Sequence, residues 1–229
     1  ITQSLNGINV ELTLKPISVL QKNNCAYVDY PNLCFVKDNQ TFQIPIRSLP
    51  FLGKHNWYNA MAAISIASLF QVSRDTILAG LESFKGLPHR IEWVAEINEV
   101  GFYNDSKATN VESAAVALES FTQPIIWIAG GYDKGNNYEL LKSIVKNHVK
   151  VVICLGKTNE SIIKAFRLLN LPMYETEVMQ EAVEIALSVA MPGEIVLLSP
   201  ACASFDLFKN FEDRGQQFKN AVNKISTKM

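Results

Sequence analysis

Three short stretches of the sequence combine charged, hydroxyl and glycine residues in a way that suits binding of an anionic small molecule. They are "NDSKATN" at 104–110, "GGYDKG" at 130–135 and "PACASFD" at 200–206. Lys107 and Lys134 offer point charges for phosphate or carboxylate oxygens. Asp105 offers a carboxylate that can accept from ribose hydroxyls or hold a metal-bound water. The chemistry that these residue types indicate is the recognition of phosphate, ribose and carboxylate groups.

Each stretch follows an apolar run that is typical of a buried strand, namely "VGFY", "IIWIA" and "IVLLS". In open parallel sheets, ligands bind beyond the carboxyl ends of the strands. We therefore expect the three stretches to meet at one edge of a sheet, and this convergence favours a functional interpretation over a purely structural one.

Taken singly, each stretch also has a structural interpretation. Asn110 can cap the following helix, with Asp105 and Thr109 in ordinary turn hydrogen bonds. Gly130 and Gly131 can form a tight connection, and they match neither the dinucleotide motif nor the phosphate loop. Ser204 can cap the last helix. The residues alone leave these alternatives open.

Further upstream, "GKHNWYNA" puts Asn56 and Asn59 on the same side of the first turn of a helix, and from the residues alone a capped helix start is the favoured interpretation. His55 and His89 lack a third ligand at a metal-binding spacing, so no zinc site is predicted. Arg90 is either a surface charge or a residue that reaches a nucleotide in a cleft between domains.

Hydrophobic patterns divide the chain into two parts. Residues 8–47 alternate in short apolar runs that predict strands and hairpins, and two helices follow, the second capped by Ser73. The break "KGLPHR" predicts a boundary between domains 1–86 and 87–229. After a hairpin, helix and strand patterns alternate to the end, which predicts an α/β domain with a doubly wound, mostly parallel sheet.

Composition excludes several classes of function. With 21 basic against 22 acidic residues and no run of like charges, neither nucleic acid nor a membrane surface is an expected partner. The cysteines form no C-x-x-C pair, and no targeting or membrane-spanning segment is present in the sequence, so we expect a cytoplasmic protein with small-molecule partners. Because the first residue is Ile1, we expect the chain to be a fragment of a longer protein.

Five segments, in this order and spacing, closely resemble the Mur ligases, and within them the D-glutamate-adding branch. They are "HNWYNAMAA", "GLPHRIEWV", "NDSKATN", "IAGGYDKG" and "LLSPACASFDLFKNFEDRG". The last segment is the most specific, whereas the "HN…N" and "HR" elements are shared with folylpolyglutamate ligases. The resemblance extends from about residue 50 to about residue 225.

The resemblance implies an ATP-dependent amide ligase of peptidoglycan synthesis with a Rossmann-like C-terminal domain. In this family ATP phosphorylates the carboxylate of the UDP-linked substrate, UDP-N-acetylmuramoyl-L-alanine, and the amine of D-glutamate then attacks the acyl phosphate. The phosphate-binding loop and the ligands of magnesium belong to a part of the family that this chain lacks. The resemblance thus implies no metal site in this fragment, a fragment inactive alone, and a monomer.

The resemblance also assigns roles to individual residues. Nucleotide contacts are implied for Asn56, Asn59, His89, Arg90 and Asp105. Lys107 and Thr109 are implied to approach the acyl phosphate and the incoming amino acid. Lys134 is implied to bind a carboxylate of D-glutamate, in a pocket completed by Ser204, the backbone amide of Phe205, and Phe211. Tyr132 and Asp133 stand at positions that vary in the family, so the geometry of the Lys134 loop is the least constrained.

Two alternatives remain open from the sequence. A folylpolyglutamate-synthase-like ligase would share the ATP chemistry but add glutamate to folate, and the "SPACAS" loop argues against it. A non-catalytic nucleotide-binding module would keep the Rossmann-like fold, and the missing phosphate loop is its best support.

Overall fold

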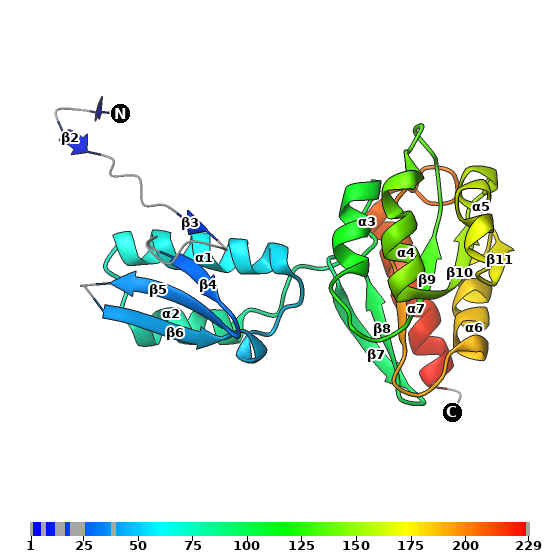
Figure 1. Ribbon diagram of the computed structural model, residues 1–229, viewed down its shortest axis with the longest axis horizontal. Helices are drawn as coiled ribbons and strands as arrows, with labels where there is room; N and C mark the ends of the chain where they lie inside the picture. The colour runs from blue at the N-terminus through cyan, green and yellow to red at the C-terminus, as the bar shows by residue number, and fades with distance from the viewer. Residues whose placement is uncertain (1, 6–7, 12–16, 19–25, 38–39, 228–229) are drawn as a thin grey trace. The chain divides into compact units, whose positions relative to one another are not determined.

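Residues 2–5, 8–11, 17–18, 26–37 and 40–227 are described by the computed structural model, in which the chain falls into two units, Ile1–Lys85 and Gly86–Met229 (Figure 1). No described helix combines the length and the apolar character needed to cross a membrane. Each unit is built around its own hydrophobic core.

The first unit contains the predicted strands. A two-stranded antiparallel ladder is formed by β1 (Thr2–Leu5) and β2 (Ile8–Glu11). A second sheet has the order β3-β4-β5-β6, with β3 (Ile17–Ser18), β4 (Ala26–Asp29), β5 (Asn32–Lys37) and β6 (Gln40–Pro45). The strands β4, β5 and β6 pair antiparallel, as the alternating runs predicted. Parts of the runs at 12–16, 19–25 and 38–39 lie outside the described residues.

Two helices complete the first unit, and the sequence predicted both. Helix α1 (Lys54–Leu69) packs on β4 and β5, where Met61 and Ile64 meet Leu33 and Phe35 in the core. Helix α2 (Arg74–Ser83) begins at Ser73, whose hydroxyl accepts a hydrogen bond from the backbone N–H of Thr76 at 3.2 Å. The predicted cap is therefore confirmed.

The second unit is an α/β domain with a six-stranded sheet in the order β11-β10-β9-β12-β8-β7. Only the edge strand β7 (Glu92–Ile97) runs antiparallel, to β8 (Val100–Asn104). The strands β9 (Ile125–Ala129), β10 (Val149–Leu155), β11 (Met173–Thr176) and β12 (Ile195–Leu198) are parallel to their neighbours. The predicted mostly parallel sheet, entered through a hairpin, is confirmed.

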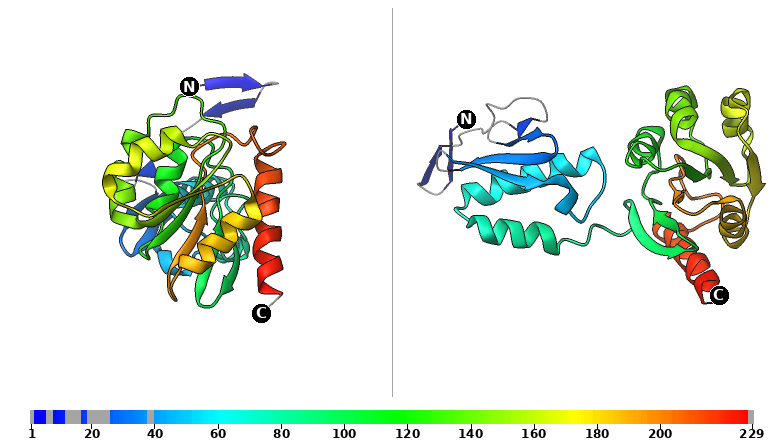
Figure 2. Two further views of the ribbon diagram at one scale, coloured as in Figure 1. Left: turned by 90° about the vertical axis from the view of Figure 1, so that its right-hand side faces the viewer. Right: turned by 60° about the horizontal axis from the view of Figure 1, so that its bottom comes forward.

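Helices cover both faces of this sheet (Figures 1 and 2). One face packs against α3 (Val111–Leu118), α4 (Lys142–His148) and α5 (Glu160–Phe166), and the other against α6 (Met179–Val189) and α7 (Phe211–Ser226). Two predicted helices are partly 3-10: Tyr138–Leu141 precedes α4, and Arg167–Leu169 follows α5. The second of these ends at Asn170, whose φ of 54° lies in the left-handed region and stops the helix.

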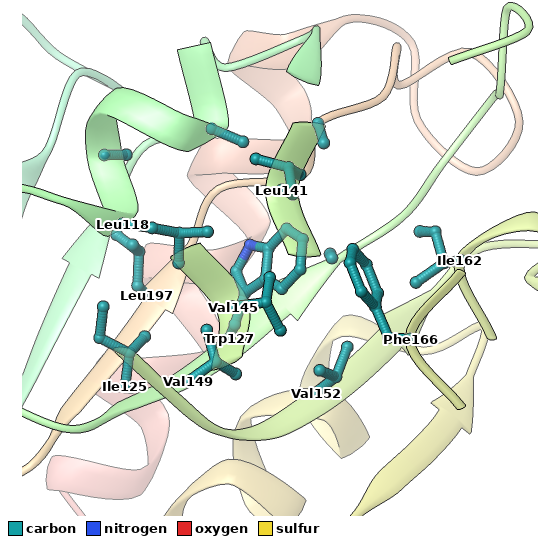
Figure 3. Packing of buried hydrophobic residues seen from close by; sticks show 14 of the residues in the cluster. Leu118, Ile125, Trp127, Leu141, Val145, Val149, Val152, Ile162, Phe166 and Leu197 are labelled. Atoms are coloured by element: carbon teal, nitrogen blue, oxygen red, sulfur yellow. The ribbon is translucent and has the colours of Figure 1, made fainter. Parts of the chain in front are cut away.

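Trp127 on β9 lies at the centre of the core on one face of the sheet. Its indole is fully buried and packs among Leu118, Leu141, Val145 and Phe166 (Figure 3). The indole nitrogen donates a 2.7 Å hydrogen bond to the carbonyl of Ser199, just beyond β12. The core therefore fixes the point at which the last of the three polar stretches begins.

Candidate functional site

The three polar stretches lie at the carboxyl ends of β8, β9 and β12, which are neighbours in the sheet. The predicted convergence is therefore found. The loop after β9 joins the loop after β12 through a short antiparallel bridge between Tyr132 and Ala203, with N···O distances of 2.8 and 3.2 Å. The amide of Gly130 also donates to the carbonyl of Pro200 at 2.8 Å.

Gly130 and Gly131 permit this close approach. Their φ angles of 118° and 129° lie in the region that favours glycine. A Cβ on Gly131 would collide with the carbonyl oxygen of Ala203, and one on Gly130 would lie 2.7 Å from the carbonyl oxygen of Leu155. The structural interpretation of Gly130 and Gly131 as a tight connection is therefore confirmed. This connection lets the loop after β9 approach the loop after β12.

A buried arginine clamps two of the loops. Arg214 on α7 is 1% exposed, and its Nε and Nη2 donate to the hydroxyl and carbonyl of Ser106 at 3.0 and 2.9 Å. Its Nη1 donates to the carbonyl of Cys202 at 3.1 Å. Burial lowers the pKa of Arg214 to about 10, so the guanidinium stays charged at neutral pH.

Arg214 was not among the predicted site residues, although the sequence contains a signal for it. The apolar side of α7 contains Phe211, Phe218 and Val222, and Arg214 lies at the helical spacing between the first two. A charged residue on the core side of a helix requires buried partners.

Asp105 is 6% exposed, and both of its carboxylate oxygens are used inside the second unit. Oδ2 accepts from the hydroxyl of Ser199 at 2.8 Å, and Oδ1 accepts from the backbone N–H of Ile91 at 3.2 Å. Burial raises the pKa of Asp105 to about 7. The carboxyl group therefore links the 104–110 loop to the loop after β12 and to the start of β7, and its nucleotide contact stays a prediction.

His89 belongs to a polar cluster in the interior of the second unit. Its backbone N–H donates to Oε2 of Glu92 at 2.9 Å, and its Nδ1 lies 2.9 Å from the amide nitrogen of Asn104. Glu92 is also paired with Lys219 on α7, at 3.0 Å. Burial lowers the pKa of His89, which favours the neutral imidazole. The side chain of Arg90, by contrast, is exposed.

The ammonium group of Lys107 lies over the face of the Phe211 ring. The Nζ atom of Lys107 is 3.7 Å from the centroid of the Phe211 ring. Phe211 is the first residue of α7, which Asn210 caps by accepting from the backbone N–H of Asp213 at 2.7 Å. Ser204 therefore does not cap the last helix, and that structural interpretation is wrong.

The remaining predicted residues of the second unit lie on the same loops. Thr109 donates its backbone N–H to the carbonyl of Lys107 at 2.8 Å, and Asn110 caps α3 by accepting from Ser113 N–H at 2.8 Å, as expected. Lys134 is exposed, Ser204 is buried, and Phe205 is 67% exposed.

Asn56 and Asn59 belong to the first unit. The amide of Asn59 donates to the side-chain oxygen of Asn56 at 3.2 Å, so the two side chains lie on one side of α1, as predicted, with Asn59 one turn beyond Asn56. Asn56 donates in turn to the carbonyl of Leu52 at 2.7 Å, whereas Gly53 occupies the capping position. The side chains thus stabilise the helix start without capping it.

Within the described part of the chain, no group of three or more His, Cys, Asp or Glu residues has the arrangement of a metal site. Cys154 and Cys202 are buried thiols. Burial raises the pKa of Cys154 to about 12 and also raises that of Cys202, so neither has the character of a nucleophile.

Comparison with known proteins identifies the second unit. Residues 89–202 match the Mur ligase glutamate ligase domain. A UDP-N-acetylmuramoylalanine–D-glutamate ligase from Christiangramia forsetii is 47% identical over 211 residues, which are 92% of this chain and 47% of that protein. One from Caldicellulosiruptor bescii is 44% identical over 90% of this chain and 46% of that protein. The chain thus spans about half the length of these relatives.

A solved structure shares the fold at low sequence identity. Thermotoga maritima MurF ligase in complex with ADP has a TM-score of 0.58 and 12% identity, covering 89% of this chain and 48% of that one. At this identity the similarity concerns the fold alone. The match over residues 89–202 and the identities of 44% and 47% show that the chain belongs to the Mur ligase family.

Proposed function

We propose that the chain is part of a cytoplasmic, ATP-dependent ligase that joins D-glutamate to UDP-N-acetylmuramoyl-L-alanine in peptidoglycan synthesis. Relatives with this activity in their names, at 39–47% identity, support the proposal. The structural observation that carries it is the junction of three strand-end loops, held by Arg214 and by the Tyr132–Ala203 bridge. This junction collects Lys107, Thr109 and Ser204 at one edge of the sheet.

Each unit has a proposed place in the ligase. Residues 1–86 form the C-terminal part of the central ATP-binding domain, and residues 87–229 form the domain that binds D-glutamate and closes over ATP. The division of the chain after Lys85 supports this assignment. A solved structure of the same fold contains ADP. The nucleotide contacts of Asn56, Asn59, His89, Arg90 and Asp105 are proposed from the resemblance of their motifs to the family.

Magnesium would accompany ATP in such an enzyme. The described residues form no group of three or more His, Cys, Asp or Glu side chains that could hold this ion, and none of them is assigned as its ligand.

The proposed reaction has two steps. The γ-phosphoryl group of ATP is transferred to the terminal carboxylate of UDP-N-acetylmuramoyl-L-alanine, which gives an acyl phosphate and ADP. The amine of D-glutamate then attacks the acyl carbon, the C–O bond to phosphate breaks, and the amine loses a proton as the amide forms. Negative charge develops on oxygen during the attack, and a lysine fixed in advance stabilises it without reorganisation.

The residues divide between the two reactants. Lys107 and Thr109 face the acyl phosphate and the incoming amine. Lys134 binds a carboxylate of D-glutamate from an exposed position, and Ser204, the amide of Phe205, and Phe211 line the same pocket. The buried Arg214 holds the loops of Lys107 and Ser204 in place.

A substrate panel tests this function. We expect the full-length protein that contains this chain to release phosphate from ATP only when both UDP-N-acetylmuramoyl-L-alanine and D-glutamate are present. L-Glutamate in place of D-glutamate, and a folate in place of the UDP substrate, serve as controls. Equal turnover with L-glutamate and a folate would contradict the assignment, as would phosphate release without either acceptor.

A further inference from the structure

The ammonium group of Lys107 is held by an aromatic ring. Its Nζ lies 3.7 Å from the centroid of Phe211, the position in which the negative face of the ring attracts a cation. Over the ranges that the structure describes, no salt bridge involves Lys107. The nearest acid in sequence, Asp105, turns its carboxylate inward to Ser199 and Ile91.

Hydrogen bonds fix the backbone on both sides of this contact. The N–H of Lys107 donates to the carbonyl of His89 at 3.0 Å. The neighbouring Ser106 donates its hydroxyl to the carbonyl of Phe211 at 2.8 Å, and Arg214 donates to the same hydroxyl at 3.0 Å. The ring of Phe211 also meets the His89 imidazole edge to face, with centroids 6.0 Å apart. The Ser106 hydroxyl therefore ties the residue before Lys107 to the main chain of Phe211, and this keeps the ammonium group close to the ring.

A ring and a carboxylate would hold this lysine differently. A carboxylate would take up the N–H donors of the ammonium in charge-assisted hydrogen bonds, and an anionic substrate would have to displace it. The face of a ring attracts the cation more weakly and accepts no conventional hydrogen bond. Phe211 can thus fix the location of the ammonium and leave its donors available.

We propose that Phe211 is a positioning residue for Lys107. Its ring holds the ammonium at the edge of the sheet, with N–H donors free for the phosphoryl oxygens of the acyl phosphate. This role is added to the lining of the amino-acid pocket. Its consequence for the reaction rests on the proposed function, whereas the contact itself does not.

The first experiment detects the contact without any assay of activity. Protons over an aromatic face are shifted upfield, so in the 229-residue chain labelled with ¹³C-lysine we expect the ε-methylene of Lys107 to lie upfield of the other lysines. Lys107→Arg assigns the signal. Phe211→Leu should abolish the shift and Phe211→Trp should keep it. An unshifted Lys107 signal in the unsubstituted chain would overturn the proposal.

The second experiment tests the role in the full-length enzyme. Fluorination of Phe211 at one, two and three ring positions preserves its shape and weakens its attraction for a cation. We expect kcat to fall stepwise by a total of roughly 5- to 10-fold, with KM for ATP and D-glutamate nearly unchanged. The same fluorination of Phe218, which is buried farther along α7, is the matched control.

The two experiments separate the possible failures. If Phe211 only lines a pocket, fluorination leaves kcat unchanged and Phe211→Leu raises KM for D-glutamate, which would overturn the positioning role. If the unsubstituted full-length protein lacks ligase activity, the proposed function fails, and the ring-current shift of Lys107 still decides whether the contact exists.

Discussion

The hydroxyl of Ser199 donates a 2.8 Å hydrogen bond to the carboxyl group of Asp105, and these two residues directly follow the neighbouring parallel strands β12 and β8. Asp105 is almost completely buried, and burial outweighs this hydrogen bond in setting its pKa, which rises to about 7. The group is therefore close to half-protonated at neutral pH. Burial disfavours the charged carboxylate, whereas the hydrogen bonds from Ser199 and Ile91 favour it.

This relationship gives the second unit a specific pH dependence. The pKa of Asp105 is higher in the folded than in the unfolded state, so the folded state binds more protons between pH 4 and pH 7. The contribution of Asp105 to the free energy of unfolding therefore falls as pH rises through this window, by up to about 4 kcal/mol. Asp105→Asn keeps the shape and removes the titration. We expect its stability relative to the unsubstituted chain to increase from pH 5 to pH 8.

Urea unfolding at the two pH values measures this difference. The exposed Glu177→Gln retains Asp105 and is the matched control, so its stability should follow that of the unsubstituted chain at both pH values. A difference between Asp105→Asn and the unsubstituted chain that is the same at pH 5 and pH 8 would show that Asp105 does not titrate in this range.

Because Arg214 clamps two of the loops, we expect its replacement to lower the stability of the second unit strongly. Arg214→Met removes the donors to Ser106 and Cys202 and leaves their carbonyl groups buried without this partner. We expect the free energy of unfolding of the second unit to fall by about 3–5 kcal/mol. Arg214→Lys keeps the charge and loses the fork of donors, so an intermediate loss should appear in urea unfolding. Lys224→Met, on the exposed side of the same helix, is the control. Equal stability of Arg214→Met and the control would refute the clamp.

Two glycines of one loop provide a matched pair. At Gly131 a Cβ collides with the backbone of Ala203, whereas at Gly135, also with positive φ, it meets nothing within 4 Å. We expect Gly131→Ala to cost roughly 2–4 kcal/mol of stability because the loops must separate, and Gly135→Ala to cost only about 1 kcal/mol of backbone strain. Thermal unfolding compares the two. Similar losses would mean that the approach of the loops is not what requires glycine at 131.

Because Lys134 is exposed, we expect its replacement to affect the use of substrate and not folding. In the full-length enzyme we expect Lys134→Ala to raise KM for D-glutamate by about 10- to 100-fold, since a charge-assisted contact contributes roughly 1.5–3 kcal/mol, with KM for ATP nearly unchanged. Lys142→Ala removes another lysine of the second unit, one paired with Glu139 at 2.7 Å, and is the control. An unchanged KM for D-glutamate would refute this role of Lys134.

Much of the architecture could be predicted from the sequence because local signals and packing agree. The continuously apolar runs of β9, β10 and β12 form strands covered on both faces, and the caps at Ser73 and Asn110 are local in sequence. Parallel topology then placed the polar stretches at one edge.

The hydrogen bonds between distant residues of the site could not be predicted in the same way. The contacts of Arg214 with Ser106 and of Asn104 with His89 span 108 and 15 positions, and no local pattern specifies such pairs. Ser204 and Asn210 are both good capping residues, and only the path of the chain between them decides that Asn210 begins α7. The inward orientation of Asp105 likewise depends on Ser199, which belongs to another strand.

Isotope transfer tests the proposed chemistry most directly. The full-length enzyme is given UDP-N-acetylmuramoyl-L-alanine with ¹⁸O in its terminal carboxylate, together with ATP and D-glutamate, and the released phosphate is analysed by mass spectrometry. Because amide formation breaks the C–O bond of an acyl phosphate, we expect one ¹⁸O atom in each phosphate and one amide of D-glutamate formed per phosphate. Phosphate without the label would mean that water or another nucleophile attacks ATP, and that no acyl phosphate forms.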